Sequence, residues 1–474
     1  MRYRLFALFA ALCVAALASP VRSLAQAPAD PFVAAPYVQL GNAPVQGRRD
    51  SLAVLWLAHD VDARWSVEYR TAGGSWRQAV APHYRRVTAS NVIRHRVYRT
   101  VLTGLEPGVE LEYRVLHNGN VVFTSKARVR KPATASTRVV VFGDCGDGSA
   151  SEKRIAFQAY AQKPDYVVIP GDIVYGAGLI SQYLTRYFPV YNAKEASPEI
   201  GAPLIRSIPF IGLPGNHDVN GRDLGATPDG LAYYLYFDEP LNGPPLSPGD
   251  PSATPIEGDD EARQAFLEAA GPAYPRMANF SFDYGNVHWT VLDADTYVDW
   301  SDPDLRAWLV ADLERAKGAT WRFVTFHQPG FSSSKSHFSE QHMRHLSPIF
   351  ERYGVDVVWC GHVHNYQRSK PLRFKPAKGA PARGVVAGEF TFDDAYDGDR
   401  VTRANGVLYI VTGGGGASLY NPEQEDAPNT WQPFTVRFLS KVHSLTVADI
   451  DGKRLTVRQI DEFGKERDRW VLTK

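Results

Sequence analysis

Residues 139–146 read VVVFGDCG, and this stretch decides the fold. Four apolar residues, three of them β-branched, predict a buried strand, and the Gly-Asp after them predicts a tight turn that carries a carboxylate. The pattern returns in DYVVIPGD (165–172), PFIGLPGNHD (209–218), RFVTFH (322–327) and VDVVWCGHVH (355–364). Each predicted strand therefore ends in a residue type that binds metals.

Helical patterns lie between some of these strands, near 152–162, 303–316 and 339–353. Alternation of strand and helix is typical of an α/β domain with buried sheets. In such sheets, ligands gather beyond the carboxyl ends of the strands. Side chains scattered over about 220 residues are therefore expected to meet in one place.

The residue types at these strand ends suit two adjacent cations. Carboxylates bridge ions and offset their charge, imidazoles suit borderline metals such as Zn and Fe, and an amide carbonyl adds a neutral oxygen. Two ions roughly 3.5–4 Å apart can clamp the attacking and leaving oxygens of a phosphoryl transfer. Any one segment alone has a plain alternative as a turn or a surface histidine, but five in order favour a metal site.

Residues 31–133 have a different pattern. SLAVLWL (51–57), WSVEY (65–69), RHRVYRTVL (94–102) and LEYRV (111–115) are separated by Gly- or Pro-containing turns, and apolar and polar residues alternate along them. Short strands at this spacing predict a β-sandwich. The segment 102–113 resembles a fibronectin type III strand entry, with Leu111 where that fold usually has an aromatic residue. No titratable residues cluster here, so we expect a scaffold or docking module.

Residues 1–25 are predicted to be a cleaved signal peptide. Arg2 and Arg4 precede an unbroken apolar run over 5–18, and small residues follow it. Fourteen apolar residues fall short of the roughly 20 that a spanning helix needs. We therefore expect a secreted or periplasmic protein with no membrane attachment after cleavage.

Composition sets further bounds. The chain has 474 residues, which predicts more than one domain. Lys+Arg 52 against Asp+Glu 51 leaves no charge excess, so we expect no nucleic-acid duplex as a partner. After signal cleavage only Cys145 and Cys360 remain, too few for a disulfide scaffold. Each lies beside a proposed ligand, and we interpret both as small buried residues rather than soft ligands.

The ordered motifs GD, GDxxY, GNH, VxxH and GHxH resemble those of the calcineurin-like metallophosphoesterase superfamily. Tyr175 in the second motif makes the chain similar to the purple acid phosphatases in particular. NFSFDYGNVH (279–288), GHVHNYQR (361–368) and VTGGGGA (411–417) agree with this resemblance. It implies a four-layer α/β/β/α metallophosphoesterase domain over 137–474, after the fibronectin type III-like sandwich.

The resemblance also implies a division of ligands and two metal ions, Fe(III) and a divalent ion (Fe, Zn or Mn). Asp144, Tyr175 and His364 would hold the ferric ion, Asp172 would bridge, and the divalent ion would bind Asn216, His327 and His362. His217 and His337 would face the phosphate, with His337 as the leaving-group acid. Cys145 and Gln367 depart from the usual family residues without removing a ligand.

The expected function is hydrolysis of phosphomonoesters of small molecules by a metal-bound hydroxide, as in an acid phosphatase. A phosphodiesterase or nucleotidase on the same metals is an alternative, because the ligand set does not separate these activities. A non-catalytic surface-binding protein is the alternative from another class. Selectivity is expected in the irregular insertion 220–274 and in the loop 331–338, and oligomeric state stays open.

Several other residues are predicted to be structural. His342 and His345, three apart on a predicted helix, are interpreted as surface histidines, and His288 as a packed core residue. The run GGGG at 413–416 lacks the Lys-Ser/Thr of a phosphate-binding loop, so a tight turn beside the metals is expected there.

Overall fold

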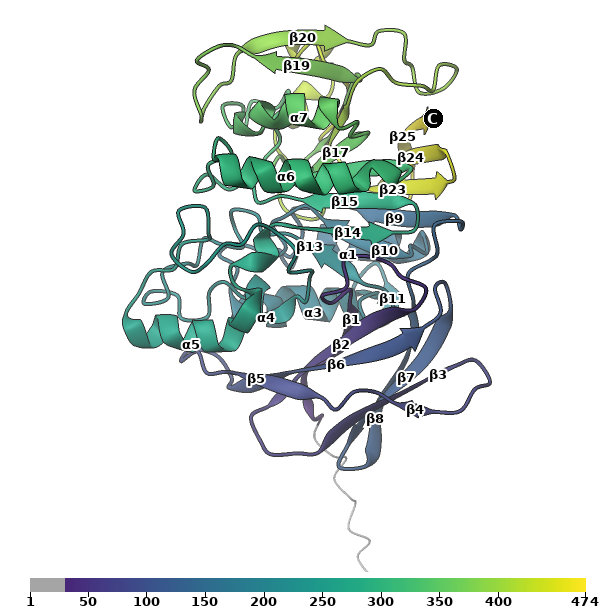
Figure 1. The fold of residues 1–474 in the computed structure, drawn as a ribbon, viewed down its shortest axis with the longest axis vertical. Helices are drawn as coiled ribbons and strands as arrows, with labels where there is room; N and C mark the ends of the chain where they lie inside the picture. Colours follow the sequence, from purple (N-terminus) through teal and green to yellow (C-terminus); the bar gives the residue numbers. More distant parts are fainter. Residues whose placement is uncertain (1–29) are drawn as a thin grey trace, which may run out of the picture.

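The computed structural model describes residues 30–474, in which an N-terminal β-sandwich packs against a larger α/β domain (Figure 1). The predicted signal peptide, 1–25, lies outside the described residues. No helix of the described part is long and apolar enough to cross a membrane.

The sandwich consists of two antiparallel four-stranded sheets, as the alternating sequence predicted. In Trp65–Thr71, buried side chains alternate with partly exposed ones, so every second residue enters the core. One sheet has the order β1 (Phe32–Gln39), β2 (Asp50–His59), β6 (His95–Leu105), β5 (His83–Val87). The other has the order β4 (Arg77–Gln78), β3 (Trp65–Thr71), β7 (Glu110–His117), β8 (Asn120–Arg128).

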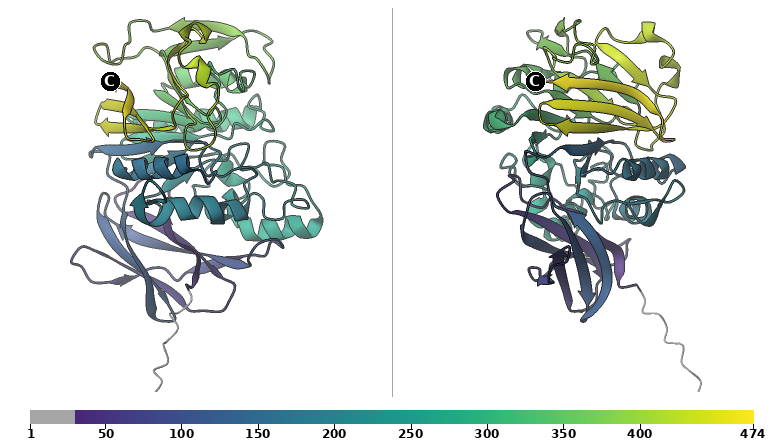
Figure 2. Two further views of the ribbon diagram at one scale, coloured as in Figure 1. Left: turned by 180° about the vertical axis from the view of Figure 1, so that it is seen from behind. Right: turned by 90° about the vertical axis from the view of Figure 1, so that its right-hand side faces the viewer.

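The α/β domain contains two larger sheets that pack face to face through one apolar core. The six-stranded sheet has the order β13 (Phe210–Gly212), β10 (Tyr166–Ile169), β9 (Thr137–Val141), β23 (Ser444–Asp451), β24 (Arg454–Asp461), β25 (Glu466–Thr473). The seven-stranded sheet has the order β14 (Phe280–Tyr284), β15 (Val287–Val291), β16 (Trp321–Phe326), β17 (Val357–Cys360), β21 (Leu408–Thr412), β18 (Tyr366–Ser369), β22 (Thr435–Leu439). The C-terminal strands, yellow in Figure 2, return to lie beside β9.

Helices cover the outer face of each sheet and complete the four layers. Helix α1 (Ala150–Ala161) packs on the six-stranded sheet, and α6 (Pro303–Arg315) and α7 (Ser347–Arg352) pack on the seven-stranded sheet. The Ser149 and Asp302 side chains accept backbone N–H groups at the first turns of α1 and α6, which fixes where these helices begin. The predicted α/β fold with its sandwich is confirmed.

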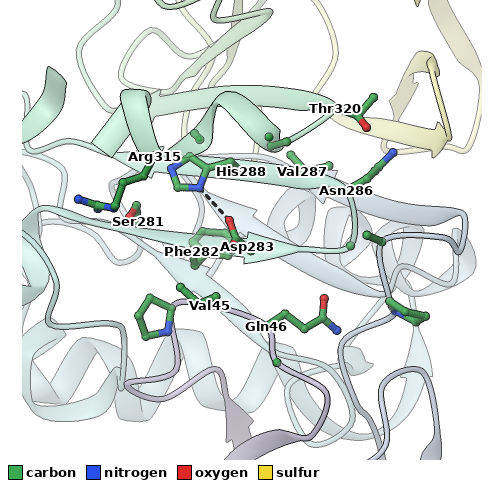
Figure 3. A pocket seen from close by; sticks show the side chains of 18 of the residues that line it. Val45, Gln46, Ser281, Phe282, Asp283, Asn286, Val287, His288, Arg315 and Thr320 are labelled. Atoms are coloured by element: carbon green, nitrogen blue, oxygen red, sulfur yellow. Dashed lines mark hydrogen bonds and ion pairs between the residues drawn. The ribbon is translucent and has the colours of Figure 1, made fainter. Parts of the chain in front are cut away.

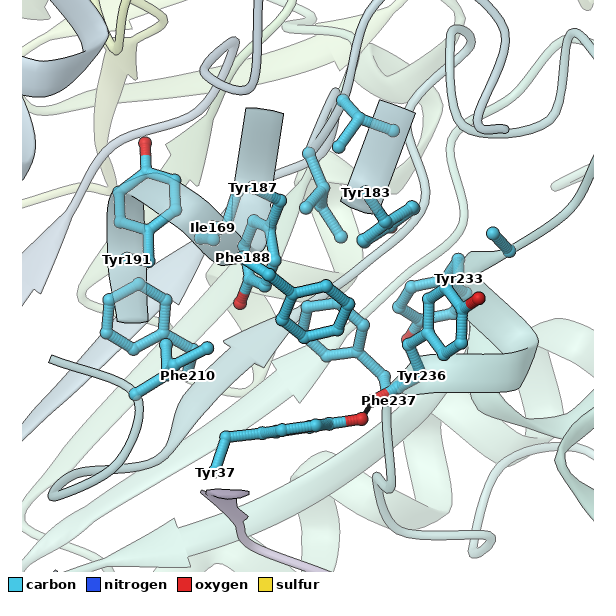
Figure 4. Close-up of a cluster of buried hydrophobic side chains, with 14 of the residues drawn as sticks. Tyr37, Ile169, Tyr183, Tyr187, Phe188, Tyr191, Phe210, Tyr233, Tyr236 and Phe237 are labelled. Carbon is cyan, nitrogen blue, oxygen red and sulfur yellow. Dashed lines mark hydrogen bonds between the residues drawn. The ribbon is translucent and has the colours of Figure 1, made fainter. Parts of the chain in front are cut away.

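The sandwich and the α/β domain share one hydrophobic cluster (Figure 4). Tyr37, Leu55 and Val97 of the sandwich belong to the same buried group as Tyr183 and Tyr236 of the α/β domain. Burying a large apolar side chain contributes about 1.5–3 kcal/mol, so this contact fixes the two parts against each other. The sequence did not indicate so intimate a contact.

The insertion 220–274 is largely irregular, as predicted. Its core, 241–258, contains no helix or strand, but the short α4 (Tyr233–Tyr236) and α5 (Asp260–Ala270) lie on either side. The predicted helix over 339–353 is wrong at its start. A 3₁₀ turn (His342–Leu346) is followed by α7, because Pro348 in the first turn of α7 has no N–H to bond the carbonyl four residues earlier and its ring clashes with that carbonyl, so one α-helix cannot run through this position.

Candidate metal centre

The side chains predicted to bind metal lie together at the carboxyl ends of strands from both large sheets. Asp144, Asp172 and Asn216 follow β9, β10 and β13 of one sheet, and His327 and His362 follow β16 and β17 of the other. Parallel strands end at the same edge, so residues far apart in sequence converge there.

The first group contains two carboxylates, a phenol and an imidazole. The hydroxyl of Tyr175 lies 3.1 Å from Asp144 Oδ1 and 3.1 Å from Asp172 Oδ2. It also lies 2.8 Å from Nε2 of His364, which is 3.3 Å from Asp144 Oδ1. All four side chains therefore direct polar atoms at the same small volume.

The second group shares Asp172 with the first. Nε2 of His327 lies 3.2 Å from Asp172 Oδ2 and 3.1 Å from Asn216 Oδ1. His362 joins this group, since its ligand atom and those of Asp172 and His327 all lie within 4.8 Å of one another. Asp172 is thus the only side chain common to the two groups, as expected of a bridging ligand.

The outer nitrogens of the imidazoles fix which atom faces the centre. His327 Nδ1 lies 2.8 Å from the carbonyl of Pro170, and His364 Nδ1 lies 2.7 Å from that of Ser418. A carbonyl only accepts, so both rings donate from Nδ1, and Nε2 is the nitrogen that faces the centre. His362 uses Nε2 to contact Glu340 and keeps Nδ1 for the centre.

The buried acidic side chains of the centre favour the binding of cations. Burial raises the pKa of Tyr175, and the charges of Asp144 and Asp172 raise it further. Burial also opposes ionisation of Asp172, but the imidazole of His327 outweighs it and lowers the pKa of Asp172. A metal ion reverses the penalty on the phenol, because it favours the charged form of a neighbouring ligand. The donor set of two carboxylates, one phenol, one amide and three imidazoles therefore suits two metal ions.

Glycine at position 215 is required by close packing. A Cβ atom there would clash with the backbone nitrogen and a carboxylate oxygen of Asp172, and with His327 Nε2. The motif GNH thus lets the backbone pass directly beside two proposed ligands, which explains the glycine before Asn216.

The structure places both proposed phosphate-facing histidines at the rim. His217 donates its backbone N–H to Asp172 Oδ1 at 2.9 Å, and its ring lies 4.5 Å from that of Tyr175. The His337 side chain is 33% exposed, and its ring lies 4.1 Å from that of His362. Both therefore reach solvent beside the ligands.

Glu340 is a site residue that the sequence analysis missed. Its two oxygens lie 2.7 Å from His337 Nδ1 and 2.9 Å from His362 Nε2. Burial alone would raise the pKa of Glu340, but the two histidine contacts lower it on balance. The carboxylate therefore orients a proposed metal ligand and the proposed acid together. The only signal for Glu340 in the sequence was its position three residues after His337.

Two further residues support the centre. The ring of Tyr420 stacks on His364, with centroids 4.0 Å apart and planes 10° apart. Gln367 accepts the backbone N–H of Ser333 at 2.7 Å and donates to Asn365 at 2.9 Å. The unusual glutamine thus ties the loop that carries His337 to the GHxH turn.

The glycine run at 413–416 is a tight turn beside the ligands, as expected. Gly413 donates to the carbonyl of Asn365 at 3.0 Å, and Gly415 donates to that of Gly143 at 3.0 Å. Cys145 and Cys360 are buried free thiols outside the described metal-ligand groups. One interpretation was wrong: His342 is buried, and its Nε2 contacts the carbonyl of Ala294 at 2.7 Å.

His288 is a core residue at the opposite end of β15 from the metal ligands. It lies beside an 850 Å³ cavity (Figure 3), with Nδ1 2.8 Å from Asp283 and Nε2 3.0 Å from Asp312. Burial lowers its pKa, but the two carboxylates more than compensate and raise it to about 9.

We predict that protonated His288 stabilises the fold below about pH 6.5 and that this stabilisation disappears as the pH rises through about 9. The shift corresponds to about 3 kcal/mol. Urea unfolding of the wild type and of His288→Asn should therefore differ most below about pH 6 and converge near pH 10. A difference that is independent of pH would contradict the charged state.

Residues 137–366 match the family model of the calcineurin-like phosphoesterases. The chain therefore carries a calcineurin-like metallophosphoesterase domain, as its motifs predicted.

Its relatives include several purple acid phosphatases and a nucleotide pyrophosphatase/phosphodiesterase of Hordeum vulgare, which is 25% identical over 64% of this chain and 76% of its own length. Purple acid phosphatase 21 of Arabidopsis thaliana is 24% identical, over 69% of this chain and 66% of the plant protein. An uncharacterized protein of Mycobacterium tuberculosis is 26% identical, over 68% of this chain and 58% of its own length. The solved structure of a purple acid phosphatase from yellow lupin seeds has the same fold, with a TM-score of 0.62 and 18% identity over 93% of this chain and 74% of the lupin chain.

Proposed function

We propose that this protein is a binuclear-metal phosphatase of the purple acid type that hydrolyses phosphomonoesters. The observation that carries the proposal is the meeting of seven donor side chains, from strand ends of two sheets, around the shared carboxylate of Asp172. The family model and the purple acid phosphatase relatives support the same class.

Asp144, Tyr175 and His364 would hold the proposed ferric ion, and Asn216, His327 and His362 would hold the proposed divalent ion (Fe, Zn or Mn). The phenol supports this division, because it contacts the first group and tyrosinate is a hard anionic ligand suited to a trivalent ion. When bound, the two ions supply an activated water and neutralise charge on the phosphate oxygens.

The chain's own residues orient the ester and manage the proton. His217 and His337 flank the centre and would hold the phosphate oxygens. Because Glu340 binds His337 Nδ1, the proton available to the leaving oxygen lies on Nε2 of that ring. Protonated His337 thus serves as the general acid for the departing alkoxide.

Replacing Tyr175 by phenylalanine should abolish the visible charge-transfer band of the iron-loaded protein while leaving the fold intact. The band arises from a phenolate on a ferric ion, and Tyr175 is the only phenol in contact with both carboxylates of the centre within residues 30–474. Visible absorption and far-ultraviolet circular dichroism measure the two effects. A colourless iron-loaded wild type would rule out the purple subclass.

A phosphodiesterase or nucleotidase is the second candidate function. Phe338 follows His337 in the chain and is 36% exposed, so the loop that carries His337 also offers an apolar side chain to solvent. A comparison of p-nitrophenyl phosphate, its bis ester and nucleotides as substrates separates these activities. Faster turnover of the bis ester than of the monoester would overturn the monoesterase proposal.

We also propose that the protein is secreted or periplasmic, on the evidence of the sequence pattern at residues 1–25. N-terminal sequencing of the exported protein tests this. A mature N-terminus near residues 26–28 is expected, and retention of Met1 in the cytoplasm would contradict it.

A further inference from the structure

Residues 229–238, here named the bridging segment, lie between the sandwich and the loop that follows Tyr175. The bridging segment includes α4 and belongs to the insertion that sequence analysis described as irregular. The bridging segment forms hydrogen bonds with the sandwich and with the loop after Tyr175. A shift of the sandwich can therefore displace this loop.

The sandwich contacts the bridging segment at several points along its length. Tyr37 donates to the carbonyl of Tyr236 at 2.8 Å, and His95 Nε2 lies 2.9 Å from the Tyr236 hydroxyl. Arg99 pairs with Asp238 at 2.6 Å. At the other end of the segment, Asn91 donates to Asp229 Oδ1 at 2.7 Å. These contacts come from β1, β6 and the loop before β6.

The bridging segment in turn holds the loop after Tyr175. Asp229 accepts the backbone N–H of Ile180 on its carbonyl at 2.7 Å. Its Oδ2 accepts the backbone N–H of Ser181 at 3.1 Å and the Ser181 hydroxyl at 2.8 Å. Ala232 donates to the carbonyl of Gly178 at 2.9 Å. The loop between a proposed metal ligand and the next helix is therefore fixed against the segment.

Asp229 connects the two sets of contacts, because it binds both the sandwich and the loop after Tyr175. Its side chain is buried, and the two carboxylate oxygens serve different partners, with Oδ1 facing the sandwich and Oδ2 facing Ser181. A buried carboxylate oxygen that loses its donor costs about 1–3 kcal/mol, so loss of the Asn91 contact favours a rearrangement of the Asp229 side chain. Changing its sandwich partner therefore changes the hold on Ser181.

We propose that the sandwich positions the Tyr175 loop through Asp229, and that Asn91 is a positioning residue for the metal centre. Partners that orient metal ligands from outside the coordination shell typically change metal affinity 10–100-fold when lost. The sandwich is thereby part of the metal site's support, although it supplies no ligand. The proposal depends on the proposed function only in taking Tyr175 as a metal ligand.

The test uses a charge exchange in the full-length protein. Asn91→Asp places a second carboxylate against Asp229, and Asn91→Asp with Asp229→Asn restores an amide–carboxylate pair with the donor on the other side. Asn120→Asp adds the same charge at the exposed first residue of β8 in the sandwich and is the matched control.

Two readouts are measured. The first is hydrogen–deuterium exchange of the amides at 176–179 in metal-free protein, and the second is the dissociation rate of Zn²⁺ into a chelator. Asn91→Asp should increase both about tenfold, the double variant should return both toward wild type, and Asn120→Asp should change neither.

Unchanged exchange and unchanged Zn²⁺ dissociation in Asn91→Asp would overturn the proposal, as would a double variant no closer to wild type than the single one. If Asn91→Asp fails to fold, the double variant and the control still decide, because the double variant must then recover folding and Zn²⁺ retention. Neither readout uses iron, colour or turnover, so failure of the phosphatase assignment would be seen separately.

Discussion

Asp172→Asn is expected to lower phosphatase turnover by about 10³-fold or more. At least one metal ion per chain should be lost as well. Asp172 is the only described side chain shared by both ligand groups, so its charge serves both ions. Loss of a single preorganised electrostatic contact already costs about 10²–10³-fold in turnover, and a bridging ligand should cost more. Elemental analysis and turnover of p-nitrophenyl phosphate measure the two effects.

Asp147→Asn is the matched control for this variant. Asp147 lies on the same loop as Asp144, and its described hydrogen bond is local, to the backbone of Ser149 at 3.0 Å. It should retain both metals and near wild-type turnover. A fully metal-loaded, active Asp172→Asn protein would show that the carboxylate does not bridge.

His337→Ala is expected to slow hydrolysis of alkyl phosphates by about 10²–10⁴-fold, the range typical of general acid catalysis. Turnover of p-nitrophenyl phosphate should fall much less, because p-nitrophenolate leaves without a proton. Metal content should not change, since His337 contacts Glu340 and no proposed ligand by hydrogen bond in the described chain. Steady-state kinetics on both substrates measure the ratio.

His345→Ala is the control, because this nearby imidazole contacts the carbonyl of Pro381 at 2.9 Å and lies outside the described metal-ligand groups. Equal losses on both substrates in His337→Ala would assign that residue to phosphate positioning. No loss on either would leave it an ordinary loop histidine, contrary to the role that its contact with Glu340 supports.

Much of the site could be predicted because its residues depend on strand ends. An apolar run predicts each strand. The glycines before Asp172 and Asn216 indicate the turns where the backbone passes close to proposed ligands. The turns that follow parallel strands lie at the same edge of a sheet, so the strand order alone predicts that their side chains meet. The alternation of the sandwich strands was equally readable, because every second residue enters one core.

Contacts made by loops could not be predicted in the same way. Glu340 lies on an irregular segment, and only the tertiary arrangement brings it between His337 and His362. His342 has no distinguishing spacing either, and its burial depends on the carbonyl of Ala294, which is 48 residues away. Periodicity carries no information on partners of this kind.

The hydrophobic cluster shared by the sandwich and the α/β domain was likewise not predictable from sequence periodicity. Tyr37 lies in β1 of the sandwich, whose last four residues are all buried, and it packs against aromatic residues of the insertion and of the segment that begins at Ile180. Sequence patterning identifies which face is buried but not which domain buries it. The proposed role of the sandwich therefore depends on contacts such as that between Asn91 and Asp229, which the sequence does not indicate.

Elemental analysis of the wild-type protein, purified without chelator and reconstituted with iron and zinc, tests the central claim most directly. The arrangement around Asp172 predicts two tightly bound metal ions per chain, at least one of them iron, together with phosphomonoesterase activity that a chelator removes and metal restores. One tightly bound ion or none after reconstitution would contradict a binuclear centre.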